Sequence, residues 1–458
     1  MAHGRITKDF TSGSIPKMLL QFMIPFMASN AMQVLYSTID MAVVGKFVGT
    51  SGLSGVAQSS QIVNFAAMLC FGFANAGQVL VAQALGAGKK KEMNGIIGTL
   101  FTFVALMALV LTAGLLLGKD LILQMMNIEK GTDFHTYATQ YMYICGGGLV
   151  LTAGYNMVSA VLRGMGDSKR PFIFIAIASV VNLVLDLLFT GLLGWGVIGA
   201  AWATIIGQAV AVGYAVIYLY KRREAFGFDF KKESFRLDGH YMKMIATLGA
   251  PMAVQSGFIH ISMLYVNAMV NGISEVASAT FGVGLRIDEI ITKLSIGIQY
   301  AALPMVSQNI AAGKQDRATK VVRWTWLYSG VFTGACMVLY WFFGTEMFKL
   351  FSDDPQVHAM CGEFIRGIMW MFPALAIMRG TSAFIQGIGN AKLSLALAIL
   401  DGVALRIGLS WLFGIALGWG FYGLVLGYAL APFGCAIPGM IYYLSGIWKK
   451  RRTLAEDI

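Results

Sequence analysis

The sequence predicts an all-α integral membrane protein with twelve transmembrane helices in two six-helix lobes. Three observations predict this fold class. Of the 458 residues, 57% are hydrophobic and only 12% are charged, whereas soluble domains carry roughly 25% charged residues. Apolar runs that can cross a bilayer, which needs ~20 residues, recur along the whole chain. The two halves of the chain also repeat one another.

Glycine, proline and charged residues divide the apolar sequence into twelve expected spans. Their expected bounds are residues 15–43, 52–84, 94–117, 134–161, 171–192, 197–220, 241–270, 277–310, 320–343, 356–386, 393–414 and 420–446.

Lysine and arginine gather in alternate connections, which fixes the expected orientation. They are Arg5, Lys8 and Lys17 before the first span, Lys89–Lys91 after the second, Arg163, Lys169 and Arg170 after the fourth, Lys221–Arg223, Lys231, Lys232 and Arg236 after the sixth, Lys314, Arg317, Lys320 and Arg323 after the eighth, Lys392 after the tenth, and Lys449–Arg452 at the end. Because basic connections stay in the cytoplasm, both termini are expected on the cytoplasmic side of a cell inner membrane. This pattern also explains the net charge of +11 without nucleic acid.

Four sequence motifs recur in the same order in both halves, at offsets of 226, 225, 223 and 224 residues. Such a nearly constant offset indicates duplication. Their paired first or central positions are Pro25 and Pro251, Gly72 and Gly297, Leu162 and Ile385, and Gly196 and Gly420.

The repeat predicts the domain organisation. An N-lobe at 1–220 and a C-lobe at 241–448 are joined by a basic cytoplasmic linker at 221–240, and 449–458 form a cytoplasmic tail. Since each lobe has an even number of spans, the two share one orientation. They are expected to be related by a pseudo-two-fold axis along the membrane normal, with the functional site between them.

Two acids inside apolar spans are the main candidates for a functional site. Asp40 ends the first apolar run, and Asp186 lies in the fifth, four residues after Asn182 on the same helical face. An intramembrane acid costs about 3 kcal/mol on insertion scales, so it is a functional candidate by default. The alternative for Asp40 is an acid at the end of a helix, in the outer interface.

Depth along the helices predicts that these acids meet. Asp40 and Asp186 each lie 15 residues after a proline, or about 22 Å at ~1.5 Å per residue. Thr204 is ~20 Å from the cytoplasm in a ~30 Å core. We therefore expect one pocket, formed by Tyr36, Asp40, Asn182, Asp186 and Thr204.

The chemistry of this pocket suits a coupling ion. Repulsion and desolvation favour the protonated form, so at least one acid can hold a proton near neutral pH. Na⁺ bound by oxygens of Asp40, Asn182, Asp186 and Thr204 is the alternative. Either ion would remove a buried charge and let the first helix bend at Pro25, where a backbone hydrogen bond is missing. No other cofactor is expected.

Substrate contacts are predicted from polar and polarizable residues in the N-lobe spans. For the amides the alternative is interhelical hydrogen bonding, and for the methionines it is lipid contact or core packing. The predicted residues are Gln33, Asn64, Asn156, Met27 and Met157.

Charged residues in the C-lobe spans are harder to interpret. Asp401 and Arg406 are five residues apart, a poor helical pair, so we expect them to partner other helices. A structural ion pair is favoured over a substrate role for these residues and for the nearby arginines Arg366 and Arg379. The group around Asp288 is expected to form a gate or a wet rim.

Five sequence motifs, taken together, make the chain resemble the MATE (multidrug and toxic compound extrusion) family over nearly its whole length. The motifs are Pro25 and Asp40 in the first span, Gln83–Gly88 ending the second, Leu162–Asp167 after the fourth, Asn182 and Asp186 in the fifth, and Gly196–Ala201 opening the sixth. The resemblance implies an antiporter that expels small organic, often cationic compounds in exchange for inward H⁺ or Na⁺. Its expected partners are such substrates and the lipid bilayer, and a monomer is expected.

The resemblance is greater to the DNA-damage-inducible and archaeal-type branch, whose ion site lies in the N-lobe. The NorM-like branch places acids in the seventh and tenth helices, where this chain has His260, Ile261 and Leu375. The alternative function is a lipid-linked oligosaccharide flippase of the same superfamily, which usually lines its N-lobe cavity with basic residues. No enzyme motif is present, so an enzyme is not expected.

Overall fold

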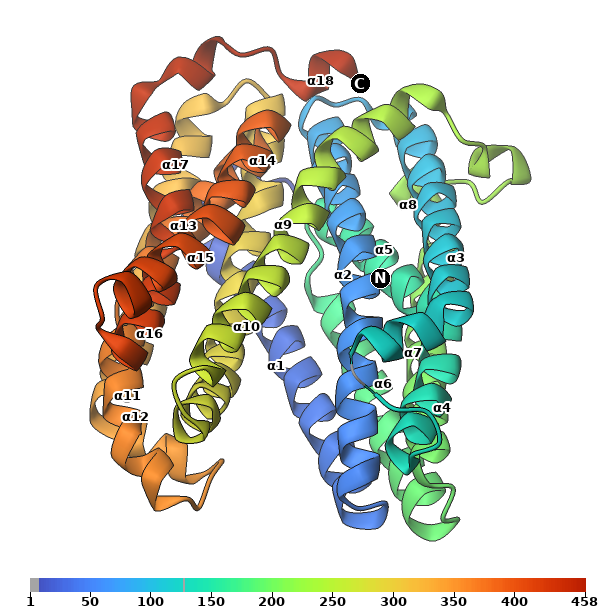
Figure 1. Cartoon of the computed structure of the whole chain (residues 1–458). Coiled ribbons are helices and arrows are strands. Elements are labelled where there is room, and N and C mark those ends of the chain that lie inside the picture. The colour runs from blue at the N-terminus through green and yellow to red at the C-terminus, as the bar shows by residue number, and fades with distance from the viewer. Residues whose placement is uncertain (1–7, 127) are drawn as a thin grey trace. The chain divides into compact units, whose positions relative to one another are not determined.

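The computed structural model describes residues 8–126 and 128–458, and the regular secondary structure within them is helical (Figure 1). The first half contains α1 (Ile15–Phe47), α2 (Thr50–Gly86), η1 (Lys90–Glu92), α3 (Met93–Met125), α4 (Asp133–Gly147), α5 (Leu149–Gly164), α6 (Lys169–Asp186), η2 (Leu187–Leu192), α7 (Gly196–Lys221), α8 (Arg223–Phe226) and η3 (Lys232–Phe235). The second half contains α9 (Gly239–Asn271), α10 (Glu275–Ala311), α11 (Gln315–Lys349), α12 (Pro355–Ile368), α13 (Met371–Gly387), α14 (Ala391–Ile399), η4 (Leu400–Leu405), α15 (Arg406–Trp411), η5 (Leu412–Ala416), α16 (Gly420–Leu430), α17 (Phe433–Ser445), η6 (Ile447–Lys450) and α18 (Leu454–Asp457). The turns η2, η4 and η5 are π-helical.

The predicted twelve-helix membrane fold is confirmed, with two of its spans bent. Ten helices of the described chain are long and apolar enough to cross a membrane. Two helix pairs, α4 with α5 and α12 with α13, meet the same criterion together and are bent by 44° and 41°. Counted as one span each, they bring the total to twelve. The spans expected at 134–161 and 356–386 are therefore each two helices, the first broken at Gly148.

The described chain folds into two compact units. The first unit contains residues 8, 28–85 and 89–249, and the second contains 9–27, 86–88 and 250–458. The change of unit falls inside α1 after Met27 and inside α9 after Gly249, each two residues from a proline, Pro25 or Pro251. Since proline removes a hydrogen bond from a helix, each helix changes unit where its backbone ladder is weakest.

The segment before α1 is fastened to the second unit. Phe10 is 0% exposed and packs edge-on against Phe22, with 5.4 Å between the ring centroids. Its backbone nitrogen donates to Gln308 Oε1 (3.1 Å). Its carbonyl accepts hydrogen bonds from Asn309 Nδ2 (3.1 Å) and Arg317 Nε (2.9 Å). These contacts hold the start of α1 against α10 and α11.

The segment after α7 folds onto α3 within the first unit. Asn94 accepts a hydrogen bond from the backbone nitrogen of Asp229 (3.2 Å) and donates one to Ser234 Oγ (3.0 Å). The hydrogen bond that Ser234 donates to Asp229 lowers the pKa of this carboxyl group, so it is charged at neutral pH. Phe228 is buried beneath this polar layer. The polar linker expected at 221–240 is thus a packed part of the first unit.

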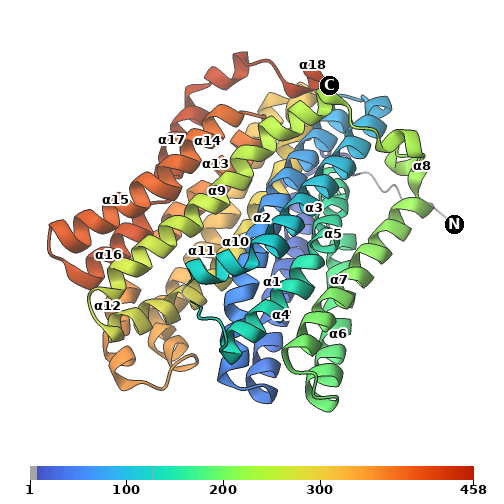
Figure 2. The same cartoon turned by 45° about the vertical axis from the view of Figure 1, so that its right-hand side comes forward.

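A glycine allows α15 and α16 to pack closely within the second unit (Figure 2). A Cβ atom added at Gly427 would lie 2.2 Å from the backbone nitrogen of Ser410. Small residues let helix backbones approach in membranes, where van der Waals packing drives helix association. Alanine at this position would therefore push the two helices apart.

We expect Gly427→Ala to lower the thermal unfolding temperature of the purified protein in detergent by several degrees, because overpacking costs about 1–3 kcal/mol. The matched control is Gly330→Ala in α11, where an added Cβ meets no atom within 4 Å. The control should leave the unfolding temperature unchanged or raise it, since alanine favours helix. Equal changes in the two variants would contradict the close packing.

Candidate functional site

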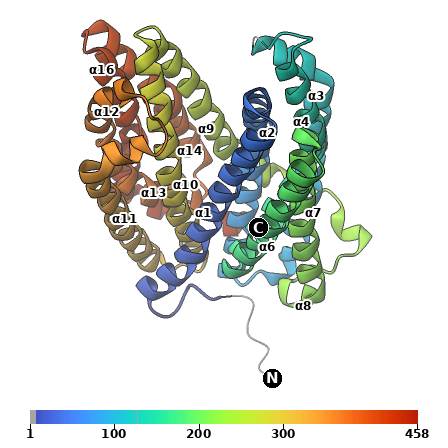
Figure 3. The ribbon, with the colours of Figure 1, turned by 90° about the horizontal axis from the view of Figure 1, so that it is seen from below.

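Two buried carboxyl groups from different helices lie side by side in the first unit. Asp40 comes from α1 and is 6% exposed, and Asp186 is the last residue of α6 and is 0% exposed. Their side chains are in direct contact. Figure 3 shows α6 beside α7, and these two helices pack extensively. The contact between two acids expected from helix depth is therefore present in the structure.

The neutral residues predicted for the pocket surround this pair. Asn182 lies against Asp186, and its Nδ2 atom donates to Thr204 Oγ1 at 3.5 Å. Tyr36 lies one helical turn before Asp40, within range of its charge. The structure brings together all five residues of the predicted pocket, from α1, α6 and α7.

The carboxyl pair has no cationic partner among the described residues. Asp40 Oδ1 and both carboxylate oxygens of Asp186 accept no hydrogen bond there. An ionised carboxylate buried without a partner is very unfavourable, and two adjacent ones repel each other. The pocket therefore binds a proton or a small cation far more readily than it holds two bare charges. Oxygen atoms of Asn182 and Thr204 are available to such a cation.

Three further residues line the pocket that the sequence analysis did not single out. Gln208 lies beside the Tyr36 hydroxyl, and Tyr141 and Cys145 of α4 lie close to the carboxyl pair. The position of Gln208, four residues after Thr204 on the same face of α7, was a usable signal. Tyr141 and Cys145 gave no comparable signal, because neutral residues in an apolar run have many packing roles.

The predicted substrate residues differ in exposure and belong to both units. Gln33 and Asn156 are half-buried, Asn64 is exposed, and Met157 is buried, all in the first unit. Met27 belongs to the second unit, where it packs against the apolar core. The burial of Met157 and the core packing of the partly buried Met27 agree with the packing alternative, and their substrate role stays a prediction.

The predicted hinge residue lies between the two ends of α1 that belong to different units. Pro25 is inside the helix, which continues without interruption from Ile15 to Phe47. The part of α1 up to Met27 belongs to the second unit, and the part after Met27 belongs to the first unit. A bend at Pro25 stays a prediction.

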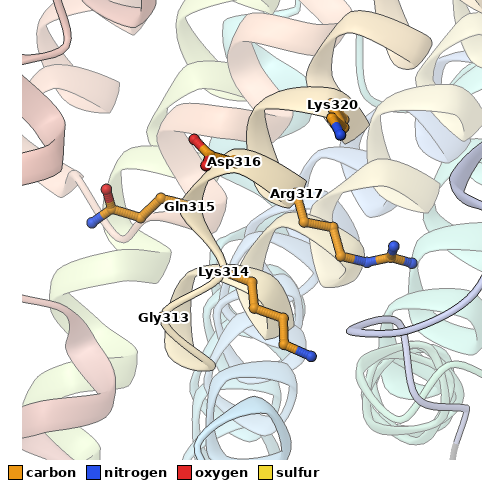
Figure 4. A pocket seen from close by; sticks show the side chains of 6 residues that line it. All are labelled: Gly313, Lys314, Gln315, Asp316, Arg317 and Lys320. Atoms are coloured by element: carbon orange, nitrogen blue, oxygen red, sulfur yellow. The ribbon is translucent and has the colours of Figure 1, made fainter.

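A surface cavity of about 480 Å³ lies at the start of α11, in the second unit, whereas the carboxyl pair lies in the first unit (Figure 4). Its basic side chains hold the segment before α1, since Lys314 Nζ donates to Thr11 O (2.9 Å) and Arg317 Nη2 donates to Ser12 O (2.6 Å). This arrangement has an anchoring role and differs from the predicted ion pocket. The cavity is lined by Gly313, Lys314, Gln315, Asp316, Arg317 and Lys320.

The expectation that Asp401 and Arg406 partner other helices is wrong. Arg406 Nη2 donates to Asp401 Oδ1 at 3.0 Å, and both side chains are buried. The physical reason is the π-turn η4, which closes hydrogen bonds between residues five apart and so brings positions i and i+5 together. The predicted structural ion pair forms, within one helical segment.

Other charges of the second unit divide into buried and exposed groups. Arg379 is buried and donates to Ser295 Oγ (3.0 Å) and Gln299 Oε1 (3.3 Å). Asp288 is 5% exposed and so is not part of a wet rim, whereas its neighbours Arg286 and Glu289 are exposed. Arg366 is exposed.

Comparison with known proteins places the chain in a family. The MatE family model matches residues 25–188 and 251–412, more than two thirds of the chain. This chain belongs to the MATE family. Members of this family are transporters, so the expectation of a multi-pass membrane transporter rather than an enzyme is confirmed.

MATE relatives align with nearly the full chain. The probable multidrug resistance protein YpnP of Bacillus subtilis (strain 168) is 28% identical over 456 residues, which cover 98% of this chain and 99% of that protein. A probable multidrug resistance protein NorM, from Thermotoga maritima, is 24% identical over 450 residues, covering 97% and 95%. A solved outward-facing multidrug resistance MATE family transporter has a TM-score of 0.91 at 20% identity, over 99% of this chain and 100% of that one. This likeness confirms the fold.

Asp186 and Asp401 are both buried, but only Asp401 is paired with an arginine, so the same substitution should affect the two acids in opposite ways. Asp186→Asn should leave the unfolding temperature unchanged or raise it, because the amide removes the repulsion between neighbouring acids. Asp401→Asn should lower stability by about 3–5 kcal/mol, because it leaves a buried arginine unpaired. Thermal unfolding of both variants in detergent at neutral pH checks this. An equal loss in both would contradict the description of Asp186 as unpaired.

Proposed function

We propose that this MATE transporter is a secondary active multidrug efflux antiporter. It exports small organic, often cationic compounds in exchange for inward H⁺ or Na⁺ by alternating access. The observation that carries the proposal is the buried Asp40–Asp186 pair, which has no cationic partner among the described residues. The names of relatives support the cargo class, since YpnP and NorM are both called probable multidrug resistance proteins.

A shared proton is the occupant that the carboxyl contact supports best. Two carboxyl groups in contact repel when both are ionised, and a proton between them turns this repulsion into a hydrogen bond. Na⁺ is the second candidate, because oxygens of Asn182 and Thr204 lie beside the pair. Entry of either ion brings one positive charge inward, which supplies about 2.3 kcal/mol per 100 mV of membrane potential.

Ion binding drives export through α1 in this proposal. Neutralising the carboxyl pair removes the repulsion at the Asp40 end of the helix and lets α1 bend at Pro25. The bend narrows the N-lobe cavity and expels the substrate. The change of unit two residues after this proline supports it as the hinge, because the two parts of the helix pack in different units.

The remaining assignments follow from the same proposal. The functional division is an N-lobe at 1–220, a linker at 221–240, a C-lobe at 241–448 and a tail at 449–458. The ion site lies in the N-lobe, as in the DNA-damage-inducible and archaeal-type branch. Basic connections support an inner-membrane location with both termini in the cytoplasm. The transporter acts as a monomer and needs no cofactor besides the coupling ion.

We expect Asp40→Asn and Asp186→Asn each to reduce ion-driven efflux of a cationic dye from proteoliposomes by at least about tenfold, because each variant lacks one of the two carboxyl groups that share the ion. The measurement imposes H⁺ and Na⁺ gradients separately, and the gradient that drives the wild type identifies the ion.

The control for this experiment is Asp133→Asn, an exposed acid in the first turn of α4, which should transport like the wild type. Reconstituted amounts and thermal unfolding establish that the variants are folded. Wild-type efflux by both pocket variants would refute the proposed ion site.

A further inference from the structure

The second unit contains an equivalent of the carboxyl pocket, and aromatic stacks fix its register. Phe189 stacks on Trp195 with 4.8 Å between ring centroids, and Phe413 stacks on Trp419 with 5.2 Å. In each stack the tryptophan backbone nitrogen donates to the phenylalanine carbonyl, at 2.9 and 3.1 Å. The equivalent residues are 224 positions apart. The same offset of 224 holds for the helical segments just before each stack, which end in the π-turns η2 and η5, and for α7 and α16, which follow the stacks.

The second repeat contains one extra residue before this region, because the offset in the preceding part of the repeat is 223. The turn after α5, where Asp167 N donates to Leu162 O (2.9 Å), matches the turn after α13, where Asn390 N donates to Ile385 O (3.0 Å). These residues are 223 positions apart. The π-turn η4 accounts for the extra residue, because the matching part of the first unit is the regular helix α6. A π-turn closes i to i+5 hydrogen bonds and so accommodates an inserted residue.

This register places an arginine at the position of a pocket asparagine. Arg406 is equivalent to Asn182, and Tyr428 is equivalent to Thr204. In the first unit Asn182 of α6 contacts Thr204 of α7, and in the second unit Arg406 of α15 contacts Tyr428 of α16. Asn182 Nδ2 lies 3.5 Å from Thr204 Oγ1, and the Arg406 guanidinium carbon lies 4.7 Å from the centre of the Tyr428 ring. The guanidinium therefore lies where the first unit presents an amide to its carboxyl pair.

The two acids of the first pocket have uncharged equivalents in the second. Ser410 is equivalent to Asp186 and donates its hydroxyl to a backbone carbonyl at 3.1 Å. Val266 is equivalent to Asp40 in the α1–α9 register. The acid next to the guanidinium comes instead from Asp401, within the added π-turn. The insertion thus supplies a counter-ion that the duplicated helices themselves do not provide.

The buried charges of the second unit balance each other. Asp401 is 0% and Arg406 is 4% exposed, and they pair at 3.0 Å. The other charged groups that act here are Asp288 from α10, which interacts with both arginines, and Arg379 from α13. Two acids therefore face two arginines. The first unit's acids face no cation among the described residues.

We propose that Arg406 is a tethered cation, which permanently takes the place in the second unit that the exchangeable ion takes in the first. Asp401 is its counter-ion. A guanidinium group keeps its proton throughout the physiological pH range, and its covalent stem prevents release across the membrane. The inference rests on the proposed function and adds that the antiporter exchanges its coupling ion through the first unit alone.

A tethered cation and a merely structural ion pair respond differently to removal of the arginine. Loss of a structural pair leaves a buried acid that a proton alone neutralises, so stability then responds to acid but not to Na⁺. Loss of a tethered cation leaves an acid in a pocket that suits a small cation, so Na⁺ from solution should stabilise the protein as well.

The experiment uses the full-length protein with Asp40→Asn and Asp186→Asn, so that the first unit binds no exchangeable ion. Thermal unfolding in detergent is followed against Na⁺, at constant ionic strength, and against pH. We expect no Na⁺-dependent shift in this background. Adding Arg406→Gln should create stabilisation by Na⁺ at constant pH, and adding Asp401→Asn as well should abolish it. The control Arg406→Lys retains a cation and should show no new response.

Two results would overturn the inference. One is an Arg406→Gln protein that folds and is stabilised by Na⁺ no more than the same protein with Asp401→Asn added. The other is stabilisation of the background protein by Na⁺ that Asp401→Asn removes, since the second unit would then bind an exchangeable ion.

A variant that lacks both charges of the Asp401–Arg406 pair keeps the inference testable if the unpaired acid prevents folding. With the first unit intact, Asp401→Asn combined with Arg406→Gln should retain ion-driven efflux within about twofold, because neutral replacement of a buried pair is tolerated. A loss of about tenfold or more in the folded double variant would overturn the inference. The single variants Asp40→Asn and Asp186→Asn, with Arg406 unchanged, test the proposed function separately.

Discussion

The contact between Asp40 and Asp186 is the constraint on which the rest of the structure depends. Both groups are buried, and α1, α6 and α7 surround them with neutral amide and hydroxyl groups instead of a lysine or arginine. Two carboxylates in such surroundings cannot both remain ionised without help from outside the protein. The pocket is therefore built to depend on a solution ion, which is the property that an ion-coupled transporter needs.

The course of α1 connects this pocket to the second unit. The part of the helix that carries Asp40 packs in the first unit, whereas its start is held in the second unit through the buried Phe10. Pro25 lies between the two parts. In the proposed mechanism, a change of charge at one end of the helix acts through Pro25 on a segment that belongs to the other unit. In the second unit, Arg406 is paired with Asp401, and we propose that this pair replaces the solution ion there.

Helix depth and repeat offsets predicted the fold and the centre of the site from the sequence. The acids and their amide partner stood out because charged residues are rare in apolar spans, and helical rise placed them at one level. Tyr141 and Cys145 did not stand out, because neutral residues in an apolar run have many packing roles, whereas Gln208 could have been found from its spacing to Thr204.

Two departures from regular helical geometry were the main obstacles to prediction. The Asp401–Arg406 pair was missed because i, i+5 spacing is unfavourable in an α-helix and favourable in a π-turn. The shift of the repeat offset from 223 to 224 already marked the extra residue. At the bend, Gly148 lets Ile205 pass closely, since an added Cβ would lie 2.0 Å from its Cδ1 atom, and such long-range packing is not visible in local sequence.

The most direct test of the central claim measures ion release when a cationic substrate binds the purified protein in weakly buffered detergent solution. A pH indicator reports released protons, and radiolabelled Na⁺ reports displaced sodium. Our account predicts that binding releases one of these ions from the wild type and none from the Asp40→Asn and Asp186→Asn proteins. Substrate binding without release of either ion from the wild type, or equal release from the variants, would contradict it.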